Sequence, residues 1–153
     1  MSAGSSRFWQ PDVTVATLVA DAGRLLCVEE SVGGALVLNQ PAGHLEPDEA
    51  LADAAVRETL EETGWHVRAT HFVGAYQWKA PSGQHFLRFA FAAEPVSHDP
   101  QRPLDDGIVR ALWLTPAELR QAGERHRSPL VWQAVEDYLA GRRFPLHAVT
   151  QVP

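Results

Sequence analysis

The sequence predicts a mixed α/β sandwich folded as a single domain. Strand-like segments come first, a helical segment follows, and further strands and two more helices complete an order that differs from regular strand–helix alternation. The length of 153 residues and the apolar share of 45% fit one globular domain that buries its own core. No repeat or linker-like stretch divides the chain.

The first strands are predicted by short apolar runs that end in turn residues. A β-branched run predicts a strand at residues 13–19, and the turn residues at 21–23 predict a hairpin into a second strand at 24–29. A third strand is expected at 36–39, followed by a loop at 40–43.

A helix is predicted at residues 48–63. The segment contains helix-forming residues throughout and no internal glycine or proline. Asp48 and Glu49 would place acidic side chains in the first turn, where the helix dipole favours them. Gly64 stands where a left-handed residue commonly ends a helix.

The second half of the chain predicts four strands and two helices. Apolar and aromatic runs place the strands at residues 65–69, 72–78, 86–93 and 108–114. Each helix is preceded by a hydroxyl residue and then proline, which is typical of a helix N-terminus. The first pair opens a short helix at 115–116, and the second opens a longer helix at 128–139.

Composition limits where the protein acts and what it binds. Cys27 is the only cysteine, which excludes an internal disulfide, favours a reducing compartment and predicts a small buried side chain. No apolar stretch is long enough for a membrane helix, and residues 1–12 lack the apolar core of a signal peptide. A formal net charge of −6 argues against a broad basic surface for nucleic acid. We therefore expect a soluble cytoplasmic domain, monomer or homodimer, that binds neither membranes nor nucleic-acid polymers.

Three acids in the predicted helix form a candidate metal site. Glu58 and Glu62 stand one helical turn apart, and Glu61 lies on the adjoining ridge. Such crowded charges repel one another, and Mg²⁺ or Mn²⁺ would neutralise them because these cations prefer carboxylate oxygens. The alternative is a solvated acidic surface braced by Arg57. The wheel positions of Glu58 and Glu62, on the partly apolar side that contains Ala55, favour the metal site.

The net negative charge is concentrated around this helix. Residues 46–62 contain seven acids and one arginine, whereas acidic and basic residues balance over the rest of the chain. The excess charge therefore predicts a local cation site, where a bound cation would let an anionic substrate dock. Gly43, in the preceding loop, would let the backbone approach closely, so its carbonyl oxygen is a further candidate ligand.

The segment at residues 43–65 resembles the signature of the Nudix family. That signature has seven fixed positions, which this chain fills with Gly43, Glu49, Arg57, Glu58, Glu61, Glu62 and Gly64. A chance match has a probability of roughly one in 10⁸ or lower. Thr59 and Trp65 depart from the pattern, since they stand at positions that are usually aliphatic. The strings at 13–16, 39–46, 87–89, 127–131 and 138–146 extend the resemblance toward a bacterial phosphatase subgroup.

The resemblance implies both a fold and an activity. The fold is α+β, a Nudix-type α/β/α sandwich with a mixed β-sheet between helices, over residues 1–153 with a core at about 9–146. The activity is metal-dependent hydrolysis of phosphoanhydride bonds in nucleoside di- and triphosphates. The subgroup resemblance adds thiamine diphosphate or its pyrimidine diphosphate precursor as substrates.

The resemblance also implies roles for the acids. Glu58 and Glu62 are expected as metal ligands, and Glu61 as a third ligand or as the base that activates water. Arg57 would orient Glu61 and Glu49 through charge-assisted hydrogen bonds. The alternative base lies in a later loop and is Asp105 or Asp106.

Three residues outside the signature are candidate substrate contacts. Arg88 interrupts an apolar strand, so its side chain either reaches into the active-site cleft to hold a phosphate or lies on the solvated face. Gln40 stands beside the glycine loop and has the same two interpretations. Trp78 either stacks on a base or pyrimidine ring or packs in the core, as does Tyr76.

Two other functions are open from the sequence. One is a Nudix enzyme of another branch, acting on dinucleoside polyphosphates or nucleotide sugars. The other is a non-catalytic, Nudix-like nucleotide-binding module. Such modules typically lose a catalytic glutamate, so the presence of Glu58, Glu61 and Glu62 argues against the second function.

Overall fold

The computed structural model describes residues 8–153, and its elements follow the predicted order. The strands are β1 (Asp12–Asp21), β2 (Arg24–Val32), β3 (Ala35–Asn39), β4 (Ala42–His44), β5 (Trp65–Lys79), β6 (His85–His98) and β7 (Ile108–Leu114). The α-helices are α1 (Leu51–Thr63), α2 (Pro116–Gln121) and α3 (Pro129–Leu139), and the 3₁₀ turns η1 and η2 cover Gly123–Arg125 and Leu146–Ala148. Residues 1–7, part of the segment predicted to lack a signal peptide, lie outside the described residues.

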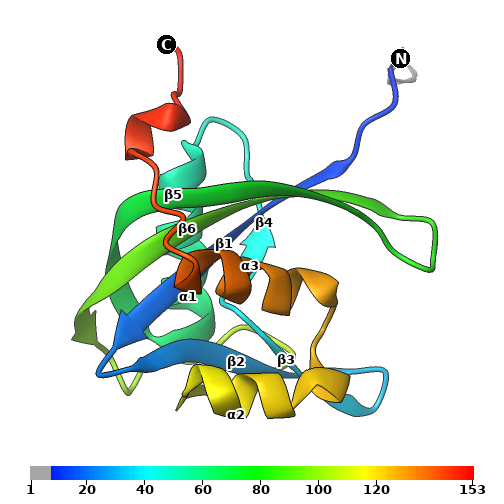
Figure 1. The fold of residues 1–153 in the computed structure, drawn as a ribbon, viewed down its shortest axis with the longest axis vertical. Helices are drawn as coiled ribbons and strands as arrows, with labels where there is room; N and C mark the ends of the chain where they lie inside the picture. Colours follow the sequence, from blue (N-terminus) through cyan, green and yellow to red (C-terminus); the bar gives the residue numbers. More distant parts are fainter. Residues whose placement is uncertain (1–7) are drawn as a thin grey trace.

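Helices α1 and α3 cover opposite faces of a mixed β-sheet (Figure 1). The strands run in the order β3-β2-β1-β6-β5, with β4 paired to β1 and β7 paired to β2. Strands β1 and β6 are parallel, and the other pairs are antiparallel. Leu18 packs in a cluster with Val131 of α3, whereas Val15 and Phe91 pack with Ala54 of α1. Because successive strand residues point to opposite faces, this alternation builds the predicted α/β/α sandwich.

The start of helix α1 and the loop before it differ from the prediction. Residues 42–44 form the short strand β4, in which Gly43 pairs with Val15 of β1. Asp48 has a φ of 66°, which a right-handed helix does not accommodate, so α1 begins at Leu51 instead of residue 48. Glu49 is consequently a loop residue. The predicted end is confirmed, because Gly64 is left-handed and donates its N–H to Leu60 at 2.9 Å.

The two strands predicted at 65–69 and 72–78 form one long strand, β5. Register shifts at 69/71 and 72/74 keep β5 paired with β6 through the polar residues that suggested a break. Strand β6 also continues to His98, beyond the predicted end at 93. The resulting β5–β6 hairpin extends beyond the sandwich (Figure 1) and brings Trp78 opposite Phe86.

The two departures from the family signature fill packing positions. The Thr59 hydroxyl donates to the Ala55 carbonyl at 2.7 Å and lies 2.7 Å from the Thr17 hydroxyl, so both buried hydroxyls are satisfied. Trp65 stacks on His98, with ring centroids 4.5 Å apart, and packs edge-to-face against Trp113. Neither departure disturbs the acidic side chains of α1.

The last two helices begin at the predicted hydroxyl–proline pairs. Thr115 accepts a hydrogen bond from the Glu118 N–H at 3.1 Å and returns one to its carboxylate at 3.0 Å. The Ser128 hydroxyl accepts one from the Leu130 N–H at 3.2 Å. Cys27 is free and buried, as predicted. Within residues 8–153, no helix is long and apolar enough to span a membrane.

Candidate active site

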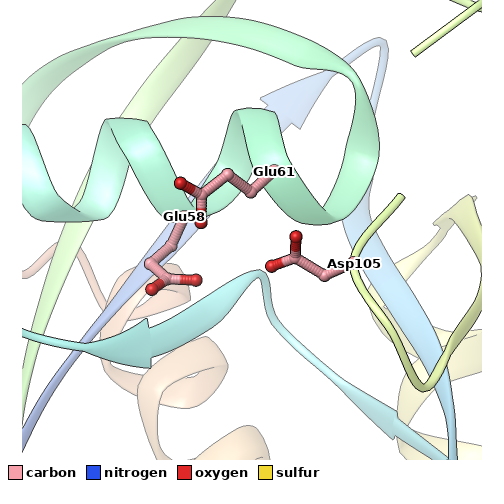
Figure 2. A group of neighbouring side chains, drawn as sticks. All are labelled: Glu58, Glu61 and Asp105. Carbon is pink, nitrogen blue, oxygen red and sulfur yellow. The ribbon is translucent and has the colours of Figure 1, made fainter. Parts of the chain in front are cut away.

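Two acids of α1 converge with an acid from the loop between β6 and β7. Glu58, Glu61 and Asp105 each contribute a carboxylate oxygen, and these oxygens lie within 4.8 Å of one another (Figure 2). The Asp105 N–H donates to the Glu61 carbonyl oxygen at 3.1 Å, which ties the loop to the last turn of the helix. The group therefore includes one of the two predicted loop acids, whereas Asp106 is exposed and lies outside it.

The electrostatics of this group suit a divalent cation. Burial raises the pKa of Glu58, against the lowering effect of the Arg57 hydrogen bond, and nearby Glu61 and Asp105 raise it further. The pKa of Asp105 is also raised, first by burial and then by Glu61. A hard divalent cation would relieve this repulsion, and carboxylate oxygens are its preferred ligands. The donor set therefore fits Mg²⁺ or a similar ion.

Arg57 links the acids of α1 to the loop that precedes this helix. Its Nε and Nη2 donate to the two carboxylate oxygens of Glu49 at 2.9 and 2.7 Å. Its Nη1 donates to Glu58 at 2.9 Å and to Glu61 at 3.2 Å, with Glu46 3.6 Å away. The predicted contacts of Arg57 with Glu49 and Glu61 are thus both present, and Glu58 is a further partner.

Replacement of Glu49 by glutamine should lower the free energy of unfolding by about 1–2 kcal/mol at pH 7, because it removes a bidentate charged pair. Arg57 holds the pKa of Glu49 below its ordinary value. A lowered folded-state pKa stabilises the fold above the unfolded-state value of about 4.3, and this stabilisation disappears as the pH falls through the folded-state pKa. Urea denaturation should therefore give converging stabilities for the two proteins below about pH 4. A difference that persists undiminished at pH 3 would contradict this assignment.

Glu62 occupies a separate and more buried position. Its Oε1 accepts a hydrogen bond from the Ala42 N–H at 2.8 Å, and the residue is 8% exposed. Burial raises its pKa to about 8, despite the lowering effect of that hydrogen bond. Glu62 thus lies against β4 and outside the group formed by Glu58, Glu61 and Asp105, and its metal-ligand role remains a prediction.

A cavity of about 520 Å³ adjoins these acids. Its lining includes Gly43, Glu58 and Glu62, together with Trp78 of β5 and Arg88 of β6. This volume falls within the range of small-molecule sites, roughly 300–1,000 Å³. The structure therefore places two of the three predicted substrate contacts, Trp78 and Arg88, in a cavity that Glu58 and Glu62 also line. Arg88 thus lies in the cleft and not on the solvated face.

The other predicted contacts do not line this cavity. Gln40 is 2% exposed, and its Nε2 donates to the Val131 carbonyl at 2.7 Å, so its amide links the end of β3 to α3. Tyr76 donates to Asp137 of α3 at 2.8 Å and packs against the core. The Gln40 side chain therefore points toward α3 and not into this cavity.

Thr14 and Asn39 are among the polar cavity-lining residues that were not predicted from the sequence. Thr14 pairs directly with Arg88 in the β1–β6 ladder, and Asn39 is the last residue of β3. Thr14 interrupts an apolar strand, as Arg88 does, whereas Asn39 ends one. Strand alternation places Thr14 on the same face as Ala16 and Leu18, and this polar interruption is the signal that could have identified it.

Comparison with known proteins identifies the family. A model of the NUDIX domain matches residues 9–133. The chain is 44% identical over 141 residues to the phosphatase NudJ of Escherichia coli (strain K12) and to that of Shigella flexneri, with 92% of both chains covered in each case. A solved NUDIX hydrolase from Nitrosomonas europaea is 47% identical, with a TM-score of 0.91 over 94% of this chain and 98% of that one. The predicted resemblance is therefore confirmed, and the chain belongs to the Nudix hydrolase family.

Proposed function

We propose that this Nudix hydrolase uses Mg²⁺, with Mn²⁺ as a substitute, to cleave phosphoanhydride bonds in nucleoside di- and triphosphates. The observation that carries the proposal is the approach of Glu58, Glu61 and Asp105 to within 4.8 Å beside a cavity of about 520 Å³. Carboxylates in this arrangement suit the metal chemistry of phosphoryl transfer. The phosphatase name of the NudJ relatives supports a phosphorylated small molecule, and thiamine diphosphate and its pyrimidine diphosphate precursor are further candidates.

The acids of the site would share the work of binding and proton transfer. Glu58 and Glu61 would hold the cation, with Glu62, Asp105 and the Gly43 carbonyl oxygen as candidates to complete its ligands. When bound, the cation neutralises charge on the non-bridging phosphate oxygens. A water molecule attacks phosphorus as the bridging P–O bond breaks, and its proton passes to a carboxylate.

Two carboxylates are candidates for this base, and the contacts that hold each of them favour one over the other. Glu61 is our first candidate for the base, because Arg57 fixes its carboxylate at 3.2 Å. Asp105 is the alternative, since the hydrogen bond from its N–H to Glu61 holds it at the same place. Arg57 also orients Glu58, so one guanidinium positions two of the three acids.

Replacement of Gly43 by alanine should reduce kcat/KM by about 10–100-fold with little effect on the fold. A methyl group at this position would overlap the Glu58 carboxylate. Because the Glu58 carboxylate lies at the end of a flexible side chain, the clash should displace this carboxylate and leave the backbone in place. Steady-state kinetics and thermal denaturation of the variant would measure both effects.

The matched control is Gly123→Ala, because an added methyl group there meets no atom within 4 Å among the described residues. This control should retain the kcat/KM of the unmodified protein. Unchanged kcat/KM in Gly43→Ala would show that the close approach of Gly43 to Glu58 does not matter for activity.

A substrate panel tests the proposed function directly. Nucleoside di- and triphosphates, thiamine diphosphate, dinucleoside polyphosphates and nucleotide sugars would be incubated with Mg²⁺, and phosphate, diphosphate and monophosphate products separated. We expect turnover of nucleoside di- or triphosphates. Exclusive turnover of dinucleoside polyphosphates or nucleotide sugars would assign the chain to another branch, and tight binding without turnover would make it a binding module.

We further propose that residues 1–153 act as one cytoplasmic domain, either as a monomer or as a homodimer, without a nucleic-acid polymer as partner. The free and buried Cys27 supports a reducing compartment. Size-exclusion chromatography with light scattering would distinguish the two oligomeric states.

A further inference from the structure

The active-site cavity contains most of the unpartnered buried polar atoms of the described chain. Within residues 8–153, five buried side-chain nitrogen or oxygen atoms have no hydrogen-bond partner. Four of them belong to cavity-lining residues: Thr14 Oγ1, Asn39 Oδ1, and Nε and Nη1 of Arg88. Folded proteins rarely leave such atoms unpaired, so a cluster of them in one cavity points to a ligand. We call Thr14, Asn39 and Arg88 the polar floor.

The members of the polar floor are close neighbours in the fold. Thr14 stands directly opposite Arg88 in the parallel β1–β6 pair. Asn39 is linked to them through Glu30, which accepts a hydrogen bond from the Asn39 Nδ2 at 3.5 Å and attracts the Arg88 guanidinium. Because Glu30 engages the Nδ2 group, the Asn39 Oδ1 remains an acceptor. The polar floor therefore combines donors from Arg88 with an acceptor from Asn39.

The burial of Arg88 makes this arrangement unfavourable without a ligand. The residue is only 7% exposed, and burial lowers its pKa to about 10, so it stays charged at neutral pH. A buried charge destabilises a fold unless its donors are paired. Glu30 and Glu62 attract the guanidinium, yet neither satisfies its Nε or Nη1. A partner with acceptor atoms is therefore missing from the chain itself.

A phosphate group does not match the whole polar floor. Its oxygens are acceptors, which would suit Arg88 but would face the Asn39 Oδ1 and the nearby carboxylates of Glu30 and Glu62. The edge of a nitrogen heterocycle presents an acceptor beside a donor and so complements both Arg88 and Asn39. The rings of Trp78 and Phe86, stacked with centroids 5.7 Å apart, also line the cavity and offer an aromatic surface.

We propose that the polar floor forms hydrogen bonds with the edge of an aromatic heterocycle in the substrate, while the acids of α1 hold the cation that binds its diphosphate. Arg88 and Asn39 are then specificity-determining residues, and Thr14 adds a hydroxyl that donates or accepts. Trp78 provides the adjoining aromatic contact. This inference rests on the proposed function and names the part of the substrate that each end of the cavity takes.

The test compares a nucleoside 5′-diphosphate with ribose 5-diphosphate, which lacks the heterocycle, in the full chain with Mg²⁺. In Arg88→Met, KM for the nucleoside diphosphate should rise about 10–100-fold, whereas KM for ribose 5-diphosphate should change less than about threefold. The melting temperature should not fall, because methionine replaces an unpaired buried charge. Thr14→Val should raise KM for the nucleoside diphosphate by a smaller factor. This variant replaces Arg88→Met as the test if Arg88→Met does not fold. Arg68→Met is the matched control, since Arg68 forms an exposed pair with Glu94.

Two outcomes of these measurements on Arg88→Met would overturn the inference and leave the proposed function intact. An equal loss on both substrates would mean that Arg88 binds phosphate. A lower melting temperature with an unchanged preference between the substrates would give Arg88 a structural role.

A binding experiment separates this inference from the proposed function. Calorimetric titration with Mg²⁺ present would compare a nucleoside 5′-monophosphate with ribose 5-phosphate. Neither compound contains a phosphoanhydride bond, so the measurement needs no turnover. We expect about tenfold tighter binding of the nucleotide by the unmodified chain and loss of that difference in Arg88→Met. Equal affinities in the unmodified chain would overturn the inference. If no diphosphate is hydrolysed but the affinities differ as expected, the proposed function fails while the polar floor stands.

Discussion

Glu61→Gln should lose about 10³-fold in kcat/KM, equivalent to about 4 kcal/mol of transition-state stabilisation, with the fold preserved. Glutamine keeps the shape of the side chain but can neither accept a proton nor bind a cation with full charge. Glu61 is partly exposed, and Arg57 keeps its hydrogen bonds to Glu49 and Glu58 without it. Steady-state hydrolysis and thermal denaturation would measure the two effects separately.

A titration with Mg²⁺ distinguishes the two roles of Glu61. If Glu61 is mainly a ligand, high Mg²⁺ concentrations should restore part of kcat, and Asp105→Asn, which removes the alternative base, should change the dependence of kcat on pH. If Glu61 is the base, kcat should stay low at saturating Mg²⁺. The matched control is Glu136→Gln, an exposed acid of α3 that should behave like the unmodified protein. Turnover near the unmodified level in Glu61→Gln would refute both roles.

Removal of divalent cations with excess EDTA should abolish hydrolysis, and added Mg²⁺ should restore it. Without a cation the crowded carboxylates of Glu58, Glu61 and Asp105 would repel an anionic substrate instead of binding it. Cation binding should also stabilise the fold, by about 2.7 kcal/mol at a concentration of 100 times the dissociation constant. Phosphate release and the melting temperature, each followed against Mg²⁺ concentration, would report the same site.

The double variant Glu58→Gln/Glu61→Gln is the control for this second measurement. It removes two of the three carboxylates, so Mg²⁺ should no longer raise its melting temperature. Full activity of the unmodified protein in excess EDTA would exclude a metal requirement. A Mg²⁺-dependent melting temperature in the double variant would place the cation elsewhere.

The core of the site was predictable because it lies on one helix. The spacing of Glu58, Glu61 and Glu62 fixes their neighbourhood wherever the helix forms, and Gly64 marks where it ends. Their individual environments were less predictable. Glu62 lies against the Ala42 N–H because residues 42–44 pair with β1, and no local pattern distinguished that short strand from a loop.

Contacts between distant segments account for the remaining differences. The sequence suggested Gln40 and Arg88 equally as substrate contacts, and only the packing of α3 directs Gln40 away from the cavity. Asp105 and Asp106 are adjacent acids, and a backbone hydrogen bond to Glu61 selects the first. The start of α1 moved from residue 48 to Leu51 because Asp48 adopts a left-handed conformation, which residue type alone does not require.

The attachment of the Asp105 loop to α1 has a consequence for the entropy of cation binding. Two carbonyl groups at the end of the helix, those of Glu61 and Gly64, accept hydrogen bonds from the N–H groups of Asp105 and Asp99. Helix ends leave such carbonyls without intrahelical partners, so the loop uses acceptors that are already available. The third carboxylate is thereby preorganised beside the other two, although it lies 44 positions after Glu61 in the chain. Little backbone then has to become ordered when a cation binds. A longer loop should therefore weaken the affinity for the cation more than it lowers the stability of the fold.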